Sequence, residues 1–172
     1  MTLGELNARD RSAFVEAIGW VFEESPWVAD RAWNKRPFAT LDGLHDAMTE
    51  VVRTASLTEQ LALLRAHPDL GTSRLQADRQ MSVASQEEQR GVGLDELTRD
   101  ELQRFGALNM AYREKFGFPF LYAVKGSTRH DILNALERRL SSPRDAEYQE
   151  ALRQVYRIAH FRLEQAIGRA GL

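Results

Sequence analysis

The chain has 172 residues and no cysteine, and its formal net charge of -2 comes from 23 basic and 25 acidic residues that are mixed along its length. A chain of this length suits one domain that buries about 70% of its unfolded surface without cross-links. The missing cysteine excludes disulfides, thiolate zinc sites, iron–sulfur clusters and a cysteine nucleophile, and it agrees with a reducing compartment. Nucleic acid is not an expected partner, because no basic face is long enough to follow a phosphate backbone.

No membrane segment is expected either. The longest apolar stretches, such as residues 118–124, are far shorter than the ~20 residues that span a bilayer. The N-terminus has no basic segment leading into an apolar one, and residues 170–172 are not the peroxisomal Ser-Lys-Leu signal. We therefore expect a cytoplasmic protein.

The first third of the chain predicts helices separated by polar breaks. An apolar stripe with helical spacing ends at Ser25 and Pro26, and a short aromatic stretch follows at residues 27–33. A second helix is predicted over residues 41–54. The first stripe consists of Phe14, Ile18, Val21 and Phe22.

The next helix begins after Ser56 and ends before Pro68. A proline disfavours helical backbone at the residue that precedes it, which here is His67. Continuing the apolar stripe of this helix by three residues places His67 on the buried side. That stripe consists of Leu57, Leu61 and Leu64.

After a polar loop, a helical pattern opens at Ser85 and continues to Lys115, where glycine and proline break it. The run Phe120–Val124 has the composition of a strand, but it is assigned to a helix or turn because no partner strand is visible. Helices at Arg129–Leu140 and Arg144–Gly168 complete the chain. Apolar residues late in the 85–115 pattern are Leu102, Phe105, Leu108, Ala111 and Tyr112.

Strand signals are too few to build a sheet, and neither an internal repeat nor a low-complexity linker divides the sequence. The expected fold is therefore an all-α helical bundle that forms a single domain over residues 1–172.

His67 is the first residue that suggests chemistry. It follows a helix whose unpaired terminal carbonyls favour a protonated imidazole, which suits a proton donor. Position alone favours at least as strongly a histidine that only caps its helix. The other histidines have no metal-ligand spacing with it or with each other, so no metal site is expected. They are His45, His130 and His160.

The segment Ser85-Gln86-Glu87-Glu88-Gln89 matches a capping box, in which Ser85 accepts from the Glu88 amide while the Glu88 side chain bonds back to Ser85. A functional interpretation requires Glu88 and Gln89 to point into a cavity and bind N–H and C=O groups of a polar heterocycle. The spacing is compatible with both interpretations, and one residue can serve both.

Arg162 interrupts the apolar stripe of the last helix, four residues after Ile158 and four before Ala166. Burying an unpaired guanidinium costs several kcal/mol, so a buried Arg162 needs a carboxylate from the protein or from a ligand. Gly91 and Gly93 lack the third glycine of a dinucleotide fingerprint, and no phosphate loop or Gly-x-Ser-x-Gly motif is present. No cofactor is expected.

Four stretches have the order and spacing of one known family across nearly the whole chain. They are Phe22 to Trp27 with Arg31 to Trp33, His67-Pro68-Asp69-Leu70, Ser85 to Leu94, and Leu108-Asn109 with Lys115 to Phe120. Together they resemble the OHCU decarboxylase family, whose substrate is 2-oxo-4-hydroxy-4-carboxy-5-ureidoimidazoline (OHCU), an intermediate of urate breakdown.

This resemblance implies an all-helical homodimer that needs no cofactor and converts this small molecule stereoselectively into (S)-allantoin, as a carboxy-lyase. It also implies that His67 is catalytic, with Glu88 beside it. Gln89 directly after Glu88 favours Glu88 over Glu87 as the acid that the family requires. The residues implied to line the substrate site are Pro68, Ser85, Gln86, Glu87, Gln89, Phe120, Leu121, Tyr122, Ala123, Val124 and Arg162.

Decarboxylation without a cofactor is reasonable, because the electrons left by carbon dioxide can delocalise into the adjacent C=N bond of the substrate. We expect His67 to engage the carboxylate or the neighbouring hydroxyl, and Glu88 and Gln89 to hold the ring and the ureido group. Arg162 would hold a substrate oxygen. Two alternatives remain: a non-catalytic helical binding module in which these residues are structural, and a decarboxylase or lyase of a related ureido acid.

Overall fold

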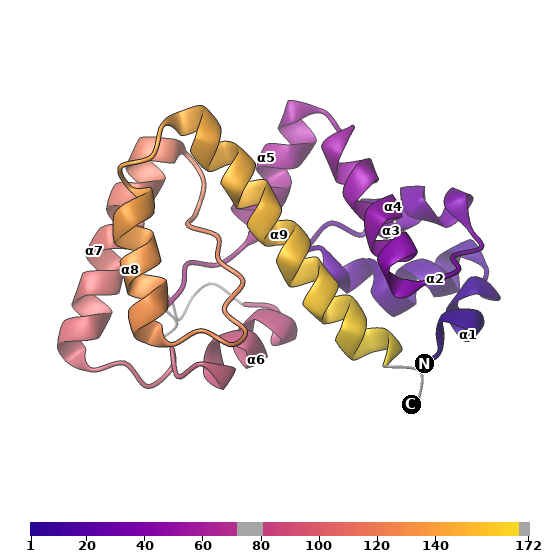
Figure 1. The fold of residues 1–172 in the computed structure, drawn as a ribbon, viewed down its shortest axis with the longest axis horizontal. Coiled ribbons are helices and arrows are strands. Elements are labelled where there is room, and N and C mark those ends of the chain that lie inside the picture. Colours follow the sequence, from indigo (N-terminus) through magenta and orange to yellow (C-terminus); the bar gives the residue numbers. More distant parts are fainter. Residues whose placement is uncertain (72–80, 169–172) are drawn as a thin grey trace. The chain divides into compact units, whose positions relative to one another are not determined.

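The computed structural model describes residues 1–71 and 81–168, and all regular elements within them are helices (Figure 1). The expected all-α fold is confirmed. The α-helices are α1 (Leu3–Asn7), α2 (Arg11–Ile18), α3 (Trp27–Ala32), α4 (Leu41–Arg53), α5 (Leu57–Ala66), α6 (Val83–Gly91), α7 (Arg99–Phe116), α8 (Arg129–Arg139) and α9 (Arg144–Ile167), and the short 3₁₀-helices are η1 (Gly19–Val21) and η2 (Trp33–Lys35).

Contacts between residues divide the chain into two compact units. The first comprises residues 1–66 and the chain from Val155 onward, and the second runs from His67 to Gln154. Helix α9 supplies residues to both units. A single domain over residues 1–172 remains a prediction. In the described part of the chain, no helix combines the length and the apolarity needed to cross a membrane.

Helices α2 to α4 build the core of the first unit. The side chain of Asp10 caps α2 by accepting from the Ala13 amide at 2.8 Å, and the predicted stripe of α2 and η1 is completely buried. The predicted aromatic stretch forms α3 and η2. Helix α4 starts at Thr40, whose hydroxyl accepts from the Gly43 amide, and it ends as predicted at Thr54.

Helix α5 ends before His67 as predicted, but its predicted apolar stripe is partly wrong. Leu57, the first residue of α5, is 63% exposed. Leu63 and Leu64 are completely buried, so only the second half of α5 contributes to the core. Of the predicted stripe, Leu64 is buried, Leu61 is half-buried and only Leu57 is exposed.

The predicted start at Ser85 is wrong, and the 85–115 pattern is two helices. Ser82 caps α6 by accepting from the Ser85 amide at 3.1 Å, so Ser85 lies in the first turn and is not the N-cap that the predicted capping box requires. Gly93, with φ of 76°, turns the chain after α6. A true capping box of Thr98 and Glu101 then starts α7.

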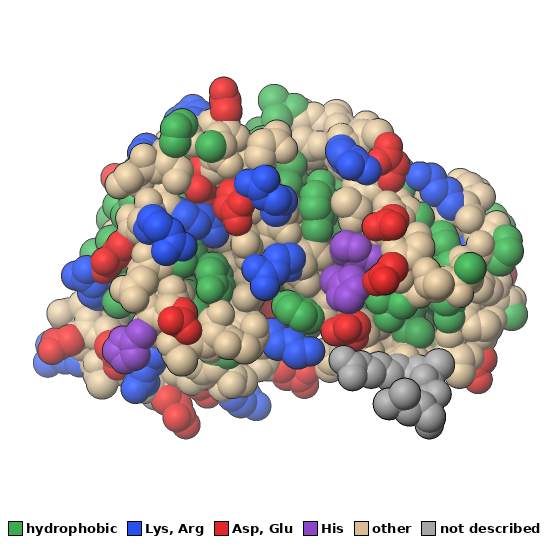
Figure 2. Space-filling model, viewed as in Figure 1, with side chains coloured by type: hydrophobic (Ala, Val, Ile, Leu, Met, Phe, Trp, Pro, Cys, Tyr) green, Lys and Arg blue, Asp and Glu red, His purple; other side chains and the backbone are tan. Residues whose placement is uncertain are grey.

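Helices α7 and α8 lie side by side in the second unit (Figure 1). Gly117, with φ of 77°, ends α7. The run Phe120–Val124 forms neither the predicted helix nor a turn, and it crosses the unit as buried irregular chain. Helices α8 and α9 agree with the predicted ranges to within one residue. On the face shown in Figure 2, acidic and basic side chains are interspersed, as the sequence predicted.

Candidate active site

His67 is the first residue after α5 and is 5% exposed. Pro68, which is half-buried, follows it and prevents the helix from continuing through the imidazole-bearing residue. Asp69 is also buried. The predicted catalytic residue therefore lies at the start of a short irregular segment, residues 67–71, within the second unit.

The side-chain amide of Gln89, on α6, holds this segment. Its Oε1 accepts from the Gly71 amide at 3.1 Å, and its Nε2 donates to the Asp69 carbonyl at 3.3 Å. Nε2 also contacts the Met81 sulfur at 3.4 Å. Gln89 was predicted to contact substrate, and the structure gives it contacts that fix the backbone on both sides of Leu70.

Two residues of α7 complete the support of residues 67–71. Asn109 Nδ2 donates to the Leu70 carbonyl at 2.9 Å, and Arg113 Nε lies 2.7 Å from Asp69 Oδ1. Sequence reasoning assigned no role to either residue. A signal for Asn109 was present, because it lies four residues after Phe105 and three before Tyr112 on the buried face of α7. A polar residue at such a position needs a hydrogen-bond partner.

Gly71 is the one position in this segment where the backbone requires glycine. Its φ is 74°, a left-handed conformation, and an added Cβ would lie 3.0 Å from side-chain atoms of Leu97 and Phe105. The segment that begins with His67 is therefore fixed by hydrogen bonds and by close packing.

The predicted site residues 85–89 lie on two different faces of α6, one buried and one exposed. Ser85 and Gln89, four residues apart, are buried, and Glu88 is half-buried beside them. Gln86 and Glu87 lie on the exposed side, where Gln86 Nε2 donates to the Met81 carbonyl at 3.0 Å. Of the two neighbouring glutamates, Glu88 is the one on the side of α6 that contacts the His67 segment through Gln89.

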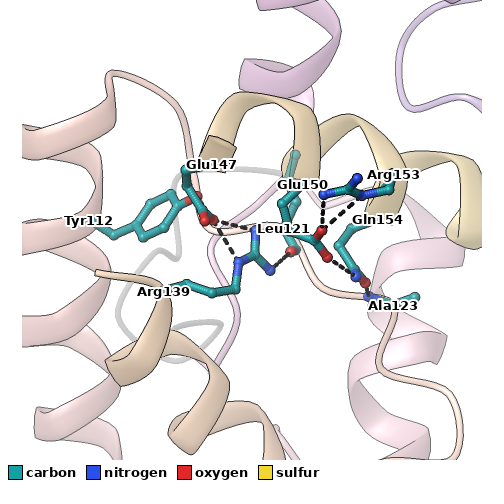
Figure 3. Close-up of polar contacts among 8 residues, drawn as sticks. All are labelled: Tyr112, Leu121, Ala123, Arg139, Glu147, Glu150, Arg153 and Gln154. Carbon is teal, nitrogen blue, oxygen red and sulfur yellow. Dashed lines mark hydrogen bonds and ion pairs between the residues drawn. The ribbon is translucent and has the colours of Figure 1, made fainter. Parts of the chain in front are cut away.

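The predicted lining segment Phe120–Val124 is buried except for Tyr122, which is half-buried. Two side chains bind its backbone (Figure 3). Arg139 Nη1 donates to the Leu121 carbonyl at 2.6 Å, and Gln154 Oε1 accepts from the Ala123 amide at 2.9 Å.

A buried polar cluster lies behind Arg139. Arg139 Nε donates to Glu147 Oε1 at 2.6 Å, and the Tyr112 hydroxyl donates to the same oxygen at 2.5 Å. Glu147 and Tyr112 are almost completely buried. Burial first, and then the hydrogen bond to Glu147, raise the pKa of Tyr112 well above its usual range, so the hydroxyl stays protonated and donates. The sequence carried no signal for this cluster.

Arg162 lies in the first unit and is 2% exposed. Its Nη1 is 2.9 Å from Glu23 Oε2, and it also lies 3.4 Å from the carbonyls of Trp20 and Val21. Burial of Arg162 is confirmed, and the carboxylate that this burial requires comes from the protein. The turn that carries Glu23 is fixed by the Ser25 hydroxyl, which donates to the Glu23 carbonyl at 2.8 Å.

Among residues 1–71 and 81–168, no group of three or more histidine, aspartate or glutamate side chains is arranged to hold a metal ion.

Comparison with known proteins assigns the family. The model of the OHCU decarboxylase family matches residues 7–164. The chain is 47% identical over 165 residues to a 2-oxo-4-hydroxy-4-carboxy-5-ureidoimidazoline decarboxylase of Halalkalicoccus jeotgali, a match that covers 96% of this chain and 91% of the relative.

Two crystal structures are similar. That of an (S)-allantoin synthase has a TM-score of 0.79 at 32% identity, over 97% of this chain and 54% of the other, so the chain spans about half of that protein. That of an OHCU decarboxylase in the presence of (S)-allantoin has a TM-score of 0.68 at 18% identity, over 94% and 100%, and shows the same fold. The chain therefore belongs to the OHCU decarboxylase family.

Proposed function

We propose that this chain decarboxylates OHCU to (S)-allantoin in urate degradation, with His67 as the catalytic residue. The names of its relatives support this reaction. The substrate is a small polar heterocycle that carries a carboxylate, a hydroxyl and a ureido group. A histidine, a glutamate and amide groups are sufficient to bind and protonate such a molecule.

The observation that carries the proposal is the support of a buried imidazole. His67 begins a segment in which residues 69–71 are held by Gln89, Asn109 and Arg113. A histidine that only capped a helix would not require three side chains from α6 and α7 to fix the chain after it. A catalytic imidazole does require a fixed backbone, because small displacements of a reacting group reduce the rate strongly.

The reaction breaks the bond between the ring carbon and the carboxylate. The electron pair of that bond passes into the adjacent C=N bond as carbon dioxide leaves, and the resulting anion takes up one proton. His67 engages the carboxylate or the neighbouring hydroxyl and thereby orients the scissile bond. Glu88 binds N–H groups of the ring or the ureido group. Gln89 contributes by holding the His67 segment, and its Oε1 can accept one further N–H.

The remaining predicted contacts belong to the same proposal. Pro68, Ser85 and the segment Phe120–Val124 line the site. Gln86, Glu87 and Arg162 are also proposed to contact the substrate. A homodimer and a cytoplasmic location are also proposed, on the family resemblance and on the missing cysteine.

The test is the decay of freshly generated OHCU with the purified protein, its His67→Ala variant and a matched His130→Ala variant. His130 is an exposed histidine in the first turn of α8. We expect His67→Ala to lower kcat about 10²- to 10⁴-fold, the usual contribution of a positioned acid–base group, with an unchanged circular dichroism spectrum. His130→Ala should keep wild-type turnover. Wild-type turnover by a folded His67→Ala variant would show that the assignment of His67 is wrong.

A further inference from the structure

We infer that Gln154 and Arg139 are positioning residues for the substrate, because they orient the peptide groups on both sides of Tyr122. This inference rests on the proposed function, in which the segment Phe120–Val124 lines the substrate site. It assigns the ureido and ring amide groups of the substrate to the backbone N–H and C=O of Tyr122.

The segment needs such support because it has neither helix nor strand hydrogen bonds. Four of its five residues are buried, and buried peptide groups need partners. The Leu121 carbonyl accepts from Arg139, and the Ala123 amide donates to Gln154. Both partners are side chains, from α8 and α9, that are themselves buried. Each of them must therefore be held in place by other groups.

Both side chains have their orientation fixed. Arg139 is bonded to Glu147 and lies over the Phe120 ring, with 4.6 Å between its guanidinium carbon and the ring centre. Gln154 Nε2 donates to Glu150 Oε1 at 2.9 Å (Figure 3). Because the amide nitrogen of Gln154 is bonded to a carboxylate, its oxygen must face the Ala123 N–H.

Because the peptide bond is planar, the two hydrogen bonds also fix the directions of the Tyr122 N–H and C=O. In a trans peptide the C=O and the following N–H point in opposite directions. The Leu121 carbonyl points at Arg139, so the Tyr122 N–H points away from Arg139. The Ala123 N–H points at Gln154, so the Tyr122 C=O points away from Gln154. Two fixed neighbours thus orient one donor and one acceptor that share a residue.

A donor and an acceptor in this arrangement match a molecule that carries N–H and C=O groups side by side, as cyclic and open ureides do. Within the described residues, neither the N–H nor the C=O of Tyr122 has a hydrogen-bond partner in the protein. The Tyr122 side chain points towards Ser127, with 3.1 Å between its hydroxyl and Ser127 Oγ. The backbone of Tyr122 is therefore the recognition element, and its side chain is not.

Arg139 is a poor residue to mutate, because its removal leaves Glu147 as a buried unpaired charge and threatens the fold. Gln154→Met is the sharper variant, since it keeps the length of the side chain and removes the acceptor of the Ala123 N–H. We expect KM for OHCU to rise roughly tenfold with little change in kcat. The reason is that the hydrogen bonds between the Tyr122 backbone and the substrate stabilise the ground state and the transition state equally. A purely structural role would instead lower apparent kcat through loss of folded protein and leave KM unchanged.

Two further variants make the result specific. Arg153→Ala disturbs the same Glu150 from the exposed side but leaves the Gln154 oxygen in place, and it should keep wild-type KM. The exchange Glu150→Gln with Gln154→Glu keeps a donor at position 150 and an acceptor facing Ala123, and it should restore most of the affinity. Hydrogen exchange of the Ala123 amide should be faster in Gln154→Met and slow again in the exchange.

The outcomes separate the two claims. If wild-type protein does not accelerate OHCU decay, the proposed function fails and the substrate assignment fails with it. If wild type is active and Gln154→Met keeps wild-type KM, or if the exchange fails to restore KM while the protein stays folded, only the positioning role of Gln154 is overturned.

Discussion

Glu23 and Arg162 form an ion pair in which each side chain is only 2% exposed. At this burial both charges have lost most of their hydration, and their mutual attraction has to offset that loss. Removing one partner takes this attraction away from a charge that remains buried. We therefore expect disruption of this pair to lower the free energy of unfolding strongly.

We predict that Glu23→Gln destabilises the protein by about 3–5 kcal/mol, because it keeps the shape of the side chain and removes the charge that balances Arg162. The matched control is Glu24→Gln, at the neighbouring exposed residue, which should change the free energy of unfolding by less than about 0.5 kcal/mol. Urea unfolding measures both. Equal stabilities of the two variants would contradict the structural role of the pair.

The burial of single polar residues could be predicted where they interrupted a local sequence pattern. His67 before a proline and Arg162 within an apolar stripe both stood out, and both are buried. Asn109 is a polar residue at a core position of α7, and this position is the only local signal for its structural role. Glu147, Arg139 and Gln154 gave no signal, because contacts between distant parts of the chain depend on how helices pack and leave no local pattern.

His45 is a half-buried titratable group that links α4 to α9 within the first unit. Its Nε2–H donates to the Tyr156 carbonyl at 2.7 Å, and its ring meets the His160 ring edge-on at 5.0 Å. Asp42 bonds His160 at 3.0 Å, and Asp46 lies near enough to act on His45 by charge. Glu164 lies 3.9 Å from His160.

Burial lowers the pKa of His45 below its ordinary value of 6.5, with repulsion from His160 acting in the same direction. Because the folded pKa lies below the unfolded one, folding favours the neutral ring. Its contribution to stability is complete above about pH 6.5 and is lost as pH falls through the folded pKa.

We therefore predict that the melting temperature of the wild type falls between about pH 7 and pH 5 more steeply than that of His45→Gln. His130→Gln, which changes an exposed histidine, should follow the wild type. Identical slopes for His45→Gln and wild type would show that His45 is not the group responsible.

Element boundaries were predictable where capping residues and breakers agreed. Helices α4, α8 and α9 begin after Thr40, Thr128 and Pro143, and they end close to the predicted residues. The error at α6 arose because Ser82 and Ser85 are both good caps, and the glutamate three residues after Ser85 completed a false capping box. The segment Phe120–Val124 was missed because side chains, which no local pattern reveals, satisfy its backbone.

At the scale of the whole molecule, the all-α class followed directly from the sequence, since no period-2 pattern competed with the helical one. The division into two units did not, because it depends on contacts between residues far apart in the sequence, which group residues 1–66 with the chain from Val155 onward. Family membership followed from four short stretches together, and the comparisons confirm it over residues 7–164. The arrangement of the site required the structure.

The proposed reaction turns OHCU into one enantiomer of allantoin with the help of a positioned imidazole. The most direct measurement follows freshly generated OHCU by absorbance and circular dichroism, with and without wild-type protein. We predict faster decay with protein and a dichroic signal of (S)-allantoin that appears before spontaneous racemisation. Decay at the protein-free rate, or a racemic product from the first time point, would contradict the account.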